Sequence, residues 1–435
     1  GTPLTVTIND VEYTTAVQAD GSWSVGITAA QVSAWPAGAV NIAVSGESSA
    51  GNPISITHPV TVDLTPAAIT INTIATDDVI NAAEKGANLT LSGTTTNVEA
   101  GQTVTVTFGG KNYTASVAGD GSWTATVPAA DLAALPEGSA SAQASVSNIN
   151  GNSASAVHSY SVDSSAPTII INTVASDNIV NASEADAGVT VSGSTTAEAG
   201  QIVTVTLNSP TVQTYQATVQ ADGSWSINIP AADLAALTDG SHTLMATVND
   251  KAGNPASTTH NLAVDLTVPV LTINTIAGDD IINATEHGQA LVISGSSTGG
   301  EAGDVVSVTL NSKTYTTTLD ASGNWSVGVP AADVTALGSG PQTVTATVTD
   351  AAGNSDSETH TVTVNLTAPT IGINTIATDD VINATEKGAD LQISGTSNQP
   401  AGTTITVTLN GQNYTATTDA SGNWSTTVPA SAVGA

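Results

Sequence analysis

Four scarcities limit what kind of protein this sequence can encode. Its 435 residues include no cysteine, no arginine, only five lysines, and 3% aromatic residues. Without cysteine the chain can form neither a disulfide nor a thiolate metal site. It also has no apolar run that approaches the roughly 18 residues of a membrane-spanning helix. The sequence therefore predicts no membrane insertion, and any metal site must use oxygen or histidine ligands.

Positive charge is the scarcest property of the chain. The sequence has 37 acidic residues against five basic ones, which gives a formal net charge of −32. Nucleic acids and anionic membrane surfaces are bound through patches of Lys and Arg, so both are excluded as partners. Divalent cations are favoured as counter-ions.

A repeat of about one hundred residues organises the chain. Hydrophobic residues make up 40% of the sequence and alternate with Thr and Ser, which is typical of β-strands and argues against disorder. Tryptophan recurs at intervals of 99 to 102 residues, each time ten residues after a tyrosine, whereas Trp35 lies outside this pattern and is expected to pack locally. The recurring tryptophans are Trp23, Trp123, Trp225, Trp325 and Trp424.

The stretch 66–166 contains seven candidate strands. A Pro-led stretch at 128–135 interrupts the alternation and predicts one or two helical turns. Seven short strands in one hundred residues predict an immunoglobulin-like sandwich, with the tryptophan at its centre in place of a disulfide. The candidate strands are 68–72, 88–93, 103–108, 112–117, 122–127, 141–147 and 156–162.

We therefore expect an all-β chain of tandem seven-stranded sandwiches arranged as an extended rod. An odd number of strands puts the two ends of each unit at opposite poles, and prolines at 66, 167, 269 and 369 should stiffen the linkers. The end units should be partial, the first lacking two opening strands and the last lacking two closing strands. The expected units are 1–65, 66–166, 167–268, 269–368 and 369–435.

An acidic loop, INTIATDDVINAAEKG at 71–86, recurs with small changes in the later units. Strand order places this loop, the end of the last strand and the NDKAGN loop of the next unit at the same junction. Oxygen ligands that converge from separate segments suit Ca²⁺, which takes six to eight oxygens in irregular geometry. The sequence predicts the ligands Asp77, Asp78, Glu84, Asp163 and Asp250 at the second junction, Asp177, Asp265 and Asp350 at the third, Asp279 and Asp280 at the fourth, and Asp63 at the first.

Two other interpretations of these residues stay open. Asp and Asn also cap turns, so the loops could be solvated turns, and the chain has no EF-hand pattern. Histidines at 58, 158, 260 and 360 lie five residues before the linker acid, or before Asn365 in its place. They are expected at the rim of the core, since no further zinc ligands lie nearby. A catalytic site copied into every unit without a nucleophile is not expected, so the sequence predicts no enzyme.

Taken together, these motifs resemble the tandem bacterial Ig-like repeats of giant surface adhesins and biofilm-associated proteins, which are exported by type I secretion. The motifs that carry the resemblance are VDLTxP at 264–269, INTIAxDDxINAxE, the DGSW or SGNW turn, VPAADLAAL, and VTDAAGN at 348–354. The resemblance implies an extracellular stalk that projects an adhesive domain and is stiffened by calcium at its junctions. Asn365, Asn178 and Asn148 replace acids of the family pattern and weaken their sites.

Three functions follow from these expectations. In the first, the chain is a structural extender that supports adhesion and biofilm formation, with host or biofilm ligands bound by domains elsewhere. In the second, the repeats themselves bind glycans or self-associate between cells, although exposed aromatics for sugar binding are scarce. In the third, the chain is an accessory stalk for a hydrolase. The first is favoured.

Overall fold

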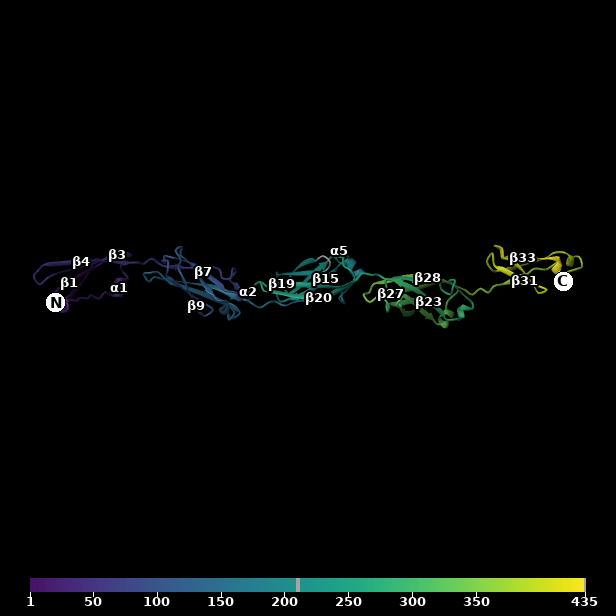
Figure 1. Cartoon of the computed structure of the whole chain (residues 1–435), viewed down its shortest axis with the longest axis horizontal. Helices are drawn as coiled ribbons and strands as arrows, with labels where there is room; N and C mark the ends of the chain where they lie inside the picture. The colour runs from purple at the N-terminus through teal and green to yellow at the C-terminus, as the bar shows by residue number, and fades with distance from the viewer. Residues whose placement is uncertain (209–211, 434–435) are drawn as a thin grey trace. The chain divides into compact units, whose positions relative to one another are not determined.

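The computed structural model of the chain describes residues 1–208 and 212–433. Contacts along the chain divide it into two compact units. Both units are built from mainly antiparallel β-sheets with short helical turns (Figure 1). The expectation of an all-β chain of tandem Ig-like sandwiches is confirmed. The first unit comprises Gly1–Val174, Thr190–Ile229 and His242–Leu262, and the second comprises Ala175–Val189, Pro230–Ser241 and Ala263–Ala435.

Segment 66–166, which lies in the first unit, shows the complete pattern. Its strands form a three-stranded sheet in the order β10-β7-β5 and a five-stranded sheet in the order β6-β12-β11-β8-β9. All seven expected strands are present, and β8 and β10 have the expected bounds. The elements are β5 Ala68–Ile69, β6 Val79–Ile80, α2 Ala82–Lys85, β7 Leu89–Thr96, β8 Thr103–Phe108, β9 Lys111–Ser116, β10 Ser122–Val127, α3 Ala129–Leu132, β11 Gly138–Ser147 and β12 Ser153–Val162.

The acidic loop contains an eighth strand that the sequence analysis did not predict. Strand β5, just before the loop, pairs antiparallel with β7 in the smaller sheet. Strand β6, inside the loop, pairs in parallel with the end of β12, where Val79 lies opposite Ser161 and Ile80 opposite Val162. The loop therefore crosses from one sheet to the other. A strand of two residues is too short to show a hydrophobic period in the sequence. Strand β6 is therefore recognised only from its pairing with β12.

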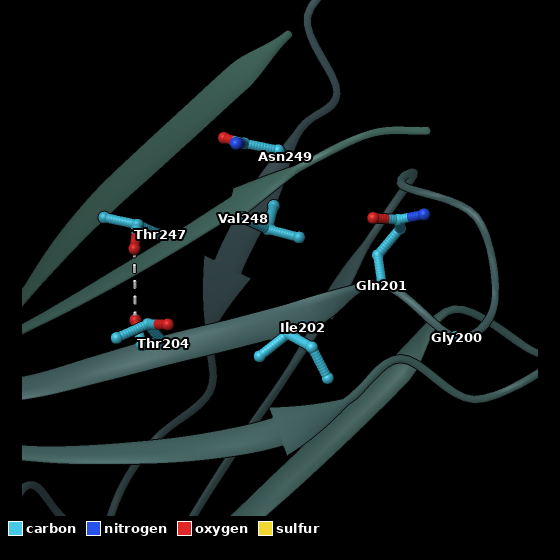
Figure 2. Close-up of a pocket in the computed structure, with 7 residues that line it drawn as sticks. All are labelled: Gly200, Gln201, Ile202, Thr204, Thr247, Val248 and Asn249. Atoms are coloured by element: carbon cyan, nitrogen blue, oxygen red, sulfur yellow. Dashed lines mark hydrogen bonds between the residues drawn. The ribbon is translucent and has the colours of Figure 1, made fainter. Parts of the chain in front are cut away.

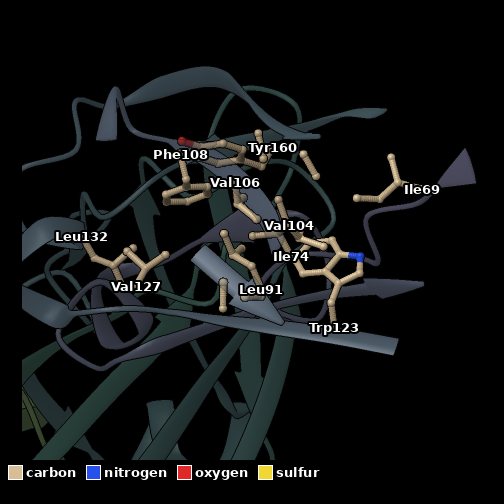
Figure 3. Packing of buried hydrophobic residues seen from close by; sticks show 14 of the residues in the cluster. Ile69, Ile74, Leu91, Val104, Val106, Phe108, Trp123, Val127, Leu132 and Tyr160 are labelled. Carbon is tan, nitrogen blue, oxygen red and sulfur yellow. The ribbon is translucent and has the colours of Figure 1, made fainter. Parts of the chain in front are cut away.

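The core of segment 66–166 lies between its two sheets (Figure 3). Alternation along β8 buries Val104, Val106 and Phe108 on one face, as expected. Phe108 stacks on Tyr160 of β12 with ring centroids 4.6 Å apart. Trp123 of β10 is 1% exposed and enters this core from the opposite sheet, as expected for the centre of a sandwich without a disulfide.

The helical turn expected at 128–135 is present as α3. Pro128 precedes its first turn in an extended conformation, and Leu132 is buried beneath the turn. A proline fits this position because the first N–H groups of a helix have no partner within the helix. The same arrangement recurs in α5, Ala231–Leu234, and α6, Ala331–Thr335.

Segments 167–268 and 269–368 repeat both strand orders. Residues of segment 167–268 belong to both units, and segment 269–368 lies in the second unit. Their further elements are β13 Ile169–Ile171, β14 Ile179–Asn181, α4 Ala182–Ala187, β15 Val189–Thr195, β16 Ile202–Asn208, β17 Gln213–Thr218, β18 Ser224–Ile229, β19 Gly240–Asn249, β20 Pro255–Asp265, β21 Val270–Ile273, β22 Ile281–Asn283, η1 Glu286–Gly288, β23 Leu291–Thr298, β24 Val305–Leu310, β25 Lys313–Thr318, β26 Asn324–Val329, β27 Gly340–Thr349 and β28 Ser355–Asn365.

The end segments hold partial sets of strands. Segment 1–65 forms one sheet in the order β2-β1-β3-β4, and segment 369–435, whose last two residues lie outside the described part, forms the sheets β29-β30-β33 and β31-β32. Their elements are β1 Pro3–Ile8, β2 Val11–Ala16, α1 Ala29–Val32, β3 Gly38–Glu47, β4 Pro53–Val62, β29 Ile371–Ile373, η2 Glu386–Gly388, β30 Leu391–Ser397, β31 Thr404–Leu409, β32 Gln412–Thr417, β33 Asn423–Val428 and α7 Ala430–Val433.

Candidate functional site

A buried asparagine joins three segments of the first unit that are distant in sequence. Asn254 is 1% exposed, and its Oδ1 accepts the N–H of Ala82 at 2.8 Å. Its Nδ2 donates to the backbone carbonyl of Asp163 and to Oδ2 of Asp250, both at 2.9 Å. We call Ala82, Asp163, Asp250 and Asn254 the Asp163 cluster. The acidic loop, the end of the last strand and the following acidic turn thus lie together, and Asn254 is the residue that connects them.

Glu84 serves the local structure beside this cluster. Its Oε2 accepts the N–H of Asn81 at 3.1 Å, and Asn81 Oδ1 accepts the N–H of Glu84 at 3.0 Å. This reciprocal capping box fixes the start of α2. A further carboxylate, that of Glu198, accepts the N–H of Lys251 at 2.9 Å.

Five carboxylates line one cavity of about 300 Å³ in the second unit. They belong to Asp239, Asp265, Glu301, Asp304 and Asp350, which we call the Asp265 cluster. Burial, followed by the negative charges of Asp350, Asp239 and Glu301, raises the pKa of Asp265 above its usual value. The cluster therefore holds charge that a cation would neutralise.

Asn354 is the counterpart of Asn254 one repeat later, and it connects the segments of the Asp265 cluster in the same way. Asn354 Oδ1 accepts the N–H of Ala182 at 2.8 Å, and its Nδ2 donates to the carbonyl of Asp265 at 3.0 Å and to Oδ2 of Asp350 at 2.9 Å. The contacts match those of the Asp163 cluster one by one.

The equivalent position near Asp63 is richer in amides. Asn150 Nδ2 donates to Oδ2 of Asp63 at 2.6 Å, and Asn152 Nδ2 donates to the carbonyl of Asp63 at 3.1 Å. The N–H of Thr65, and then the Asn150 side chain, lower the pKa of Asp63. Of the residues that line the adjacent cavity of about 360 Å³, only Asp63 and Glu99 carry a carboxylate. We call Asp63, Asn150 and Asn152 the Asp63 cluster. Here the neutral side-chain amide of Asn150 already donates a hydrogen bond to the Asp63 carboxylate.

The second aspartate of the acidic loop has partners inside its own segment. Asp78 Oδ1 accepts the N–H of Ile74 at 2.8 Å and lies 2.6 Å from Nε2 of His158. The Ile74 N–H, and then His158, lower the pKa of Asp78. Asp280 makes the equivalent contacts with Ile276 and His360, which is 26% exposed, as expected at the rim of the core.

The first aspartate of each loop closes a local turn. Asp77, Asp177 and Asp279 each accept, at 2.9–3.0 Å, the N–H of the residue two positions later. This contact is the Asx turn of the alternative interpretation. Of the predicted ligands, the structure thus gathers Asp163 with Asp250 and Asp265 with Asp350, whereas Asp77, Asp78, Asp177, Asp279 and Asp280 have local partners.

Sequence analysis missed three carboxylates of the Asp265 cluster. Glu301 belongs to an EAG motif that also occurs at Glu99 and Glu198, so the repeat itself carried a signal. Asp239 precedes the glycine that opens β19, in the position that Glu137 has before β11. Asp304 has no acidic counterpart in the other segments, so nothing in the repeat marked it.

Two further observations limit the chemistry of these sites. Among residues 1–208 and 212–433, no group of three or more His, Cys, Asp or Glu side chains is arranged so that it could hold a metal ion. Figure 2 shows a separate hollow beside β16 and β19, in which Thr247 Oγ1 donates to the carbonyl of Thr204 at 3.4 Å. Its lining contains no ionisable side chain.

Comparison with known proteins places the chain in a family. The family model of the bacterial Ig-like domain matches residues 167–266 and 274–366. A Ca²⁺-stabilized adhesin that helps an Antarctic bacterium reach out and bind ice is 38% identical over 85% of this chain and 92% of its own. The chain belongs to the bacterial Ig-like domain family.

Other solved structures are similar to this bacterial Ig-like chain. A 1.5-MDa bacterial ice-binding adhesin is 36% identical over 70% of this chain and 100% of its own. A tetra-tandem repeat in the extending region of a large adhesion protein is 26% identical over 84% of this chain and 92% of its own. The TM-scores of these two structures and of the Antarctic adhesin are 0.37, 0.35 and 0.38.

A search of curated proteins gives no match. Within the described residues of this Ig-like chain, no helix has the length and apolar character needed to cross a membrane.

Proposed function

We propose that this chain is part of the extender, or stalk, region of a large bacterial cell-surface adhesin. Three features support the proposal: the tandem Ig-like sandwiches, the family match, and the 36–38% identity to repeats of large adhesins. The role is structural and not catalytic. In this proposal the chain lies outside the cell, on a type I-secreted protein. That protein supports adhesion and biofilm formation through domains elsewhere, and the expected segments of this chain serve as spacers in an extended rod.

Calcium at the acidic clusters is the second part of the proposal. The observation that carries it is the Asp265 cluster, where five carboxylates share one cavity and the pKa of Asp265 is raised. Hard oxygen donors from separate segments suit Ca²⁺ better than Mg²⁺, which demands near-octahedral geometry. When bound, the ion would neutralise the mutual repulsion of the carboxylates.

The three clusters form a graded series in one chain. The Asp265 cluster has five carboxylates and the highest expected affinity. The Asp163 cluster has Asp163 and Asp250, with Glu198 contacting the residue after Asp250. In the Asp63 cluster the side chain of Asn150 replaces a cation at Asp63, so the lowest affinity is expected there. Calcium affinity of such sites rises with the number of charged ligands.

Titration calorimetry with calcium on the whole chain tests this part of the proposal. Asp350→Asn should weaken the tightest class of sites about tenfold, since one charged ligand is lost. Asp279→Asn is the matched control, because it removes the same charge from a turn outside the clusters. Heats without a calcium-binding phase, or equal affinities for both variants, would refute calcium binding at the Asp265 cluster.

A further inference from the structure

The turn between β11 and β12 contains an Asn-Gly pair, Asn150–Gly151, and such a pair occurs only once more in the sequence, at Asn410–Gly411. In an Asn-Gly pair the backbone nitrogen of the glycine can attack the side-chain Cγ of the asparagine, because the glycine has no side chain to hinder the approach. The attack closes a succinimide ring and releases the side-chain nitrogen as ammonia. Water then opens the ring, so the asparagine becomes aspartate or isoaspartate and gains a negative charge.

The surroundings of Asn150 leave room for this reaction. Asn150 and Gly151 are both exposed, so water reaches the ring. A Cβ on Gly151 would meet nothing within 4 Å, so the space beside the attacking nitrogen is open. The Gly151 N–H donates to the carbonyl of Asn148 at 3.0 Å, so the ring closes only when this turn opens. Exposed turns open locally at a low cost in free energy.

Asn148, in the same turn, is protected from the reaction. It is 5% exposed, and the next residue is Ile149, whose branched side chain hinders attack by its backbone nitrogen. The Oδ1 of Asn148 also accepts the N–H groups of Asn150 at 3.2 Å and of Asn152 at 2.9 Å. Asn150 is therefore the amide beside Asp63 that is open to conversion.

Conversion of Asn150 reverses the electrostatics of the Asp63 cluster. Asn150 Nδ2 donates to Oδ2 of Asp63 at 2.6 Å, and deamidation replaces this donor with a second carboxylate. Two adjacent carboxylates repel each other. A third carboxylate lies close by, since Glu99 Oε2 accepts the N–H of Ile149 at 2.9 Å and Glu99 lines the same cavity as Asp63. Carboxylates from three separate loops then share this region.

The later repeats show what this turn gains. Where it has Asn148 the counterparts carry an aspartate, and where it has Asn150 they carry an alanine, which has no amide to lose. All three turns are closed alike, by an N–H that donates at 2.9–3.1 Å to the carbonyl of the asparagine four residues later. Deamidation of Asn150 thus supplies a charge that the other turns have from the start. The counterparts are Asp250 and Asp350, and Ala252 and Ala352.

We propose that Asn150 deamidates spontaneously, and that the new carboxylate turns the Asp63 cluster from an amide-bonded pair into a binding site for a divalent cation. The calcium part of this inference rests on the proposed function, whereas the deamidation does not. The change is irreversible, so the age of the chain sets its extent. A new chain has the low calcium affinity expected at the Asp63 cluster, and an aged chain gains a further charged ligand there.

Incubation of the whole chain in water enriched in heavy oxygen tests the deamidation. The water that opens the ring leaves one labelled oxygen in the product, so peptide mapping by mass spectrometry should find label at residue 150, in aspartate and isoaspartate. Asn150→Gln is the matched variant, because glutamine keeps the amide but needs a larger ring, and its residue 150 should stay unlabelled. An unlabelled Asn150, or equal label in the variant, would overturn the proposal.

The variant Asn150→Asp imitates the product and tests the calcium part separately. In titration calorimetry on the whole chain, it should strengthen the weakest class of calcium sites about tenfold, since one charged ligand is added. Asn112→Asp is the matched control, because it adds the same charge on the exposed face of β9, where residue 112 still accepts the hydroxyl of Thr107.

Equal calcium affinities in Asn150→Asp and Asn112→Asp would overturn the calcium part, even with label at residue 150. A calcium-binding phase that is missing from every chain would refute the proposed function as well, and the label at residue 150 would still decide the deamidation.

Discussion

At the scale of single residues, one glycine makes room for the central tryptophan in each sandwich. A Cβ on Gly295 would lie 1.9 Å from the carbonyl oxygen of Thr272 and 2.7 Å from the ring of Trp325. Gly93, Gly193 and Gly395 show the same close approach. Both neighbours belong to paired strands, so neither can move without disturbing the sheet.

Gly295→Ala should therefore destabilise its sandwich by at least about 2 kcal/mol, because an overpacked core strains the paired strands. Thermal or urea unfolding measures the loss. The matched control is Gly328→Ala on the neighbouring strand β26, where an added Cβ meets nothing within 4 Å. Equal stability of both variants would show that the close packing of Trp325 does not limit the sandwich.

A tyrosine held by an aspartate gives a pH dependence that can be measured at the same scale. Tyr113 donates from its hydroxyl to Asp131 Oδ2 at 2.8 Å, and Lys111 pairs with Oδ1 of the same carboxylate. Burial, and then the hydrogen bond to Asp131, raise the pKa of Tyr113 to about 12. The same causes, with Asp333 as the partner, raise the pKa of Tyr315 to about 12.

The raised pKa predicts a loss of stability in alkali. The folded chain keeps the Tyr113 proton between the ordinary tyrosine pKa of 10.0 and about 12, whereas the unfolded chain releases it. This contribution is fully present below the lower value and is lost as the pH rises through the interval. Tyrosinate absorbance measures the effect: Asp131→Asn should lower the ionisation midpoint of Tyr113, whereas Asp120→Asn, in an exposed turn, should leave it unchanged. Equal ionisation midpoints in the Asp131→Asn variant and the unchanged chain would exclude Asp131 as a cause of the raised pKa of Tyr113.

At the scale of elements, buried asparagines fasten the acidic loops. Asn254→Ala would leave the N–H of Ala82 and the carbonyl of Asp163 without this partner, at an expected cost of about 2 kcal/mol. Hydrogen exchange at the Ala82 amide should accelerate accordingly. Asn152→Ala is the natural comparison and should cost less, since among the described residues the Asn152 side chain donates one hydrogen bond, to the carbonyl of Asp63. Unchanged exchange at Ala82 would show that other contacts hold the loop.

Elements with a clear period were predictable from sequence, and those decided by pairing or capping were not. Alternation along β8 and β10 predicted both strands to the residue. Strand β6 exists because β12 offers a free edge beside it. The same limit applies to Asp78, which the sequence predicts as a calcium ligand, whereas its partners in the structure are the N–H of Ile74 and the distant His158.

The candidate site was likewise predictable in part. The order of the strands indicated that the loops near Asp163 and Asp250 would meet, and in the structure Asn254 joins them. Glu301 and Asp239 were missed because each lies in a different loop from the conspicuous acidic motif. Convergence of single residues from several loops depends on tertiary structure, which a local pattern does not contain.

At the scale of the whole molecule, the charge of −32 favours divalent cations as counter-ions, and the proposed function assigns calcium this role. Like charges in shared cavities repel one another, and a divalent ion bound between them replaces that repulsion with attraction. The graded clusters predict that calcium fills the Asp265 cluster first and the Asp63 cluster last. If calcium ties together segments that are distant in sequence, it should stiffen the chain at the clusters and leave each sandwich unchanged.

Small-angle scattering of the whole chain, in millimolar calcium and then in excess chelator, tests this claim most directly. Extrapolation to zero concentration removes any association between copies. The proposal predicts a larger maximum dimension in calcium and a shorter, more variable chain after chelation, with circular dichroism unchanged. Identical scattering profiles in both conditions would contradict a calcium-stiffened stalk and assign the clustered acids to solvated turns.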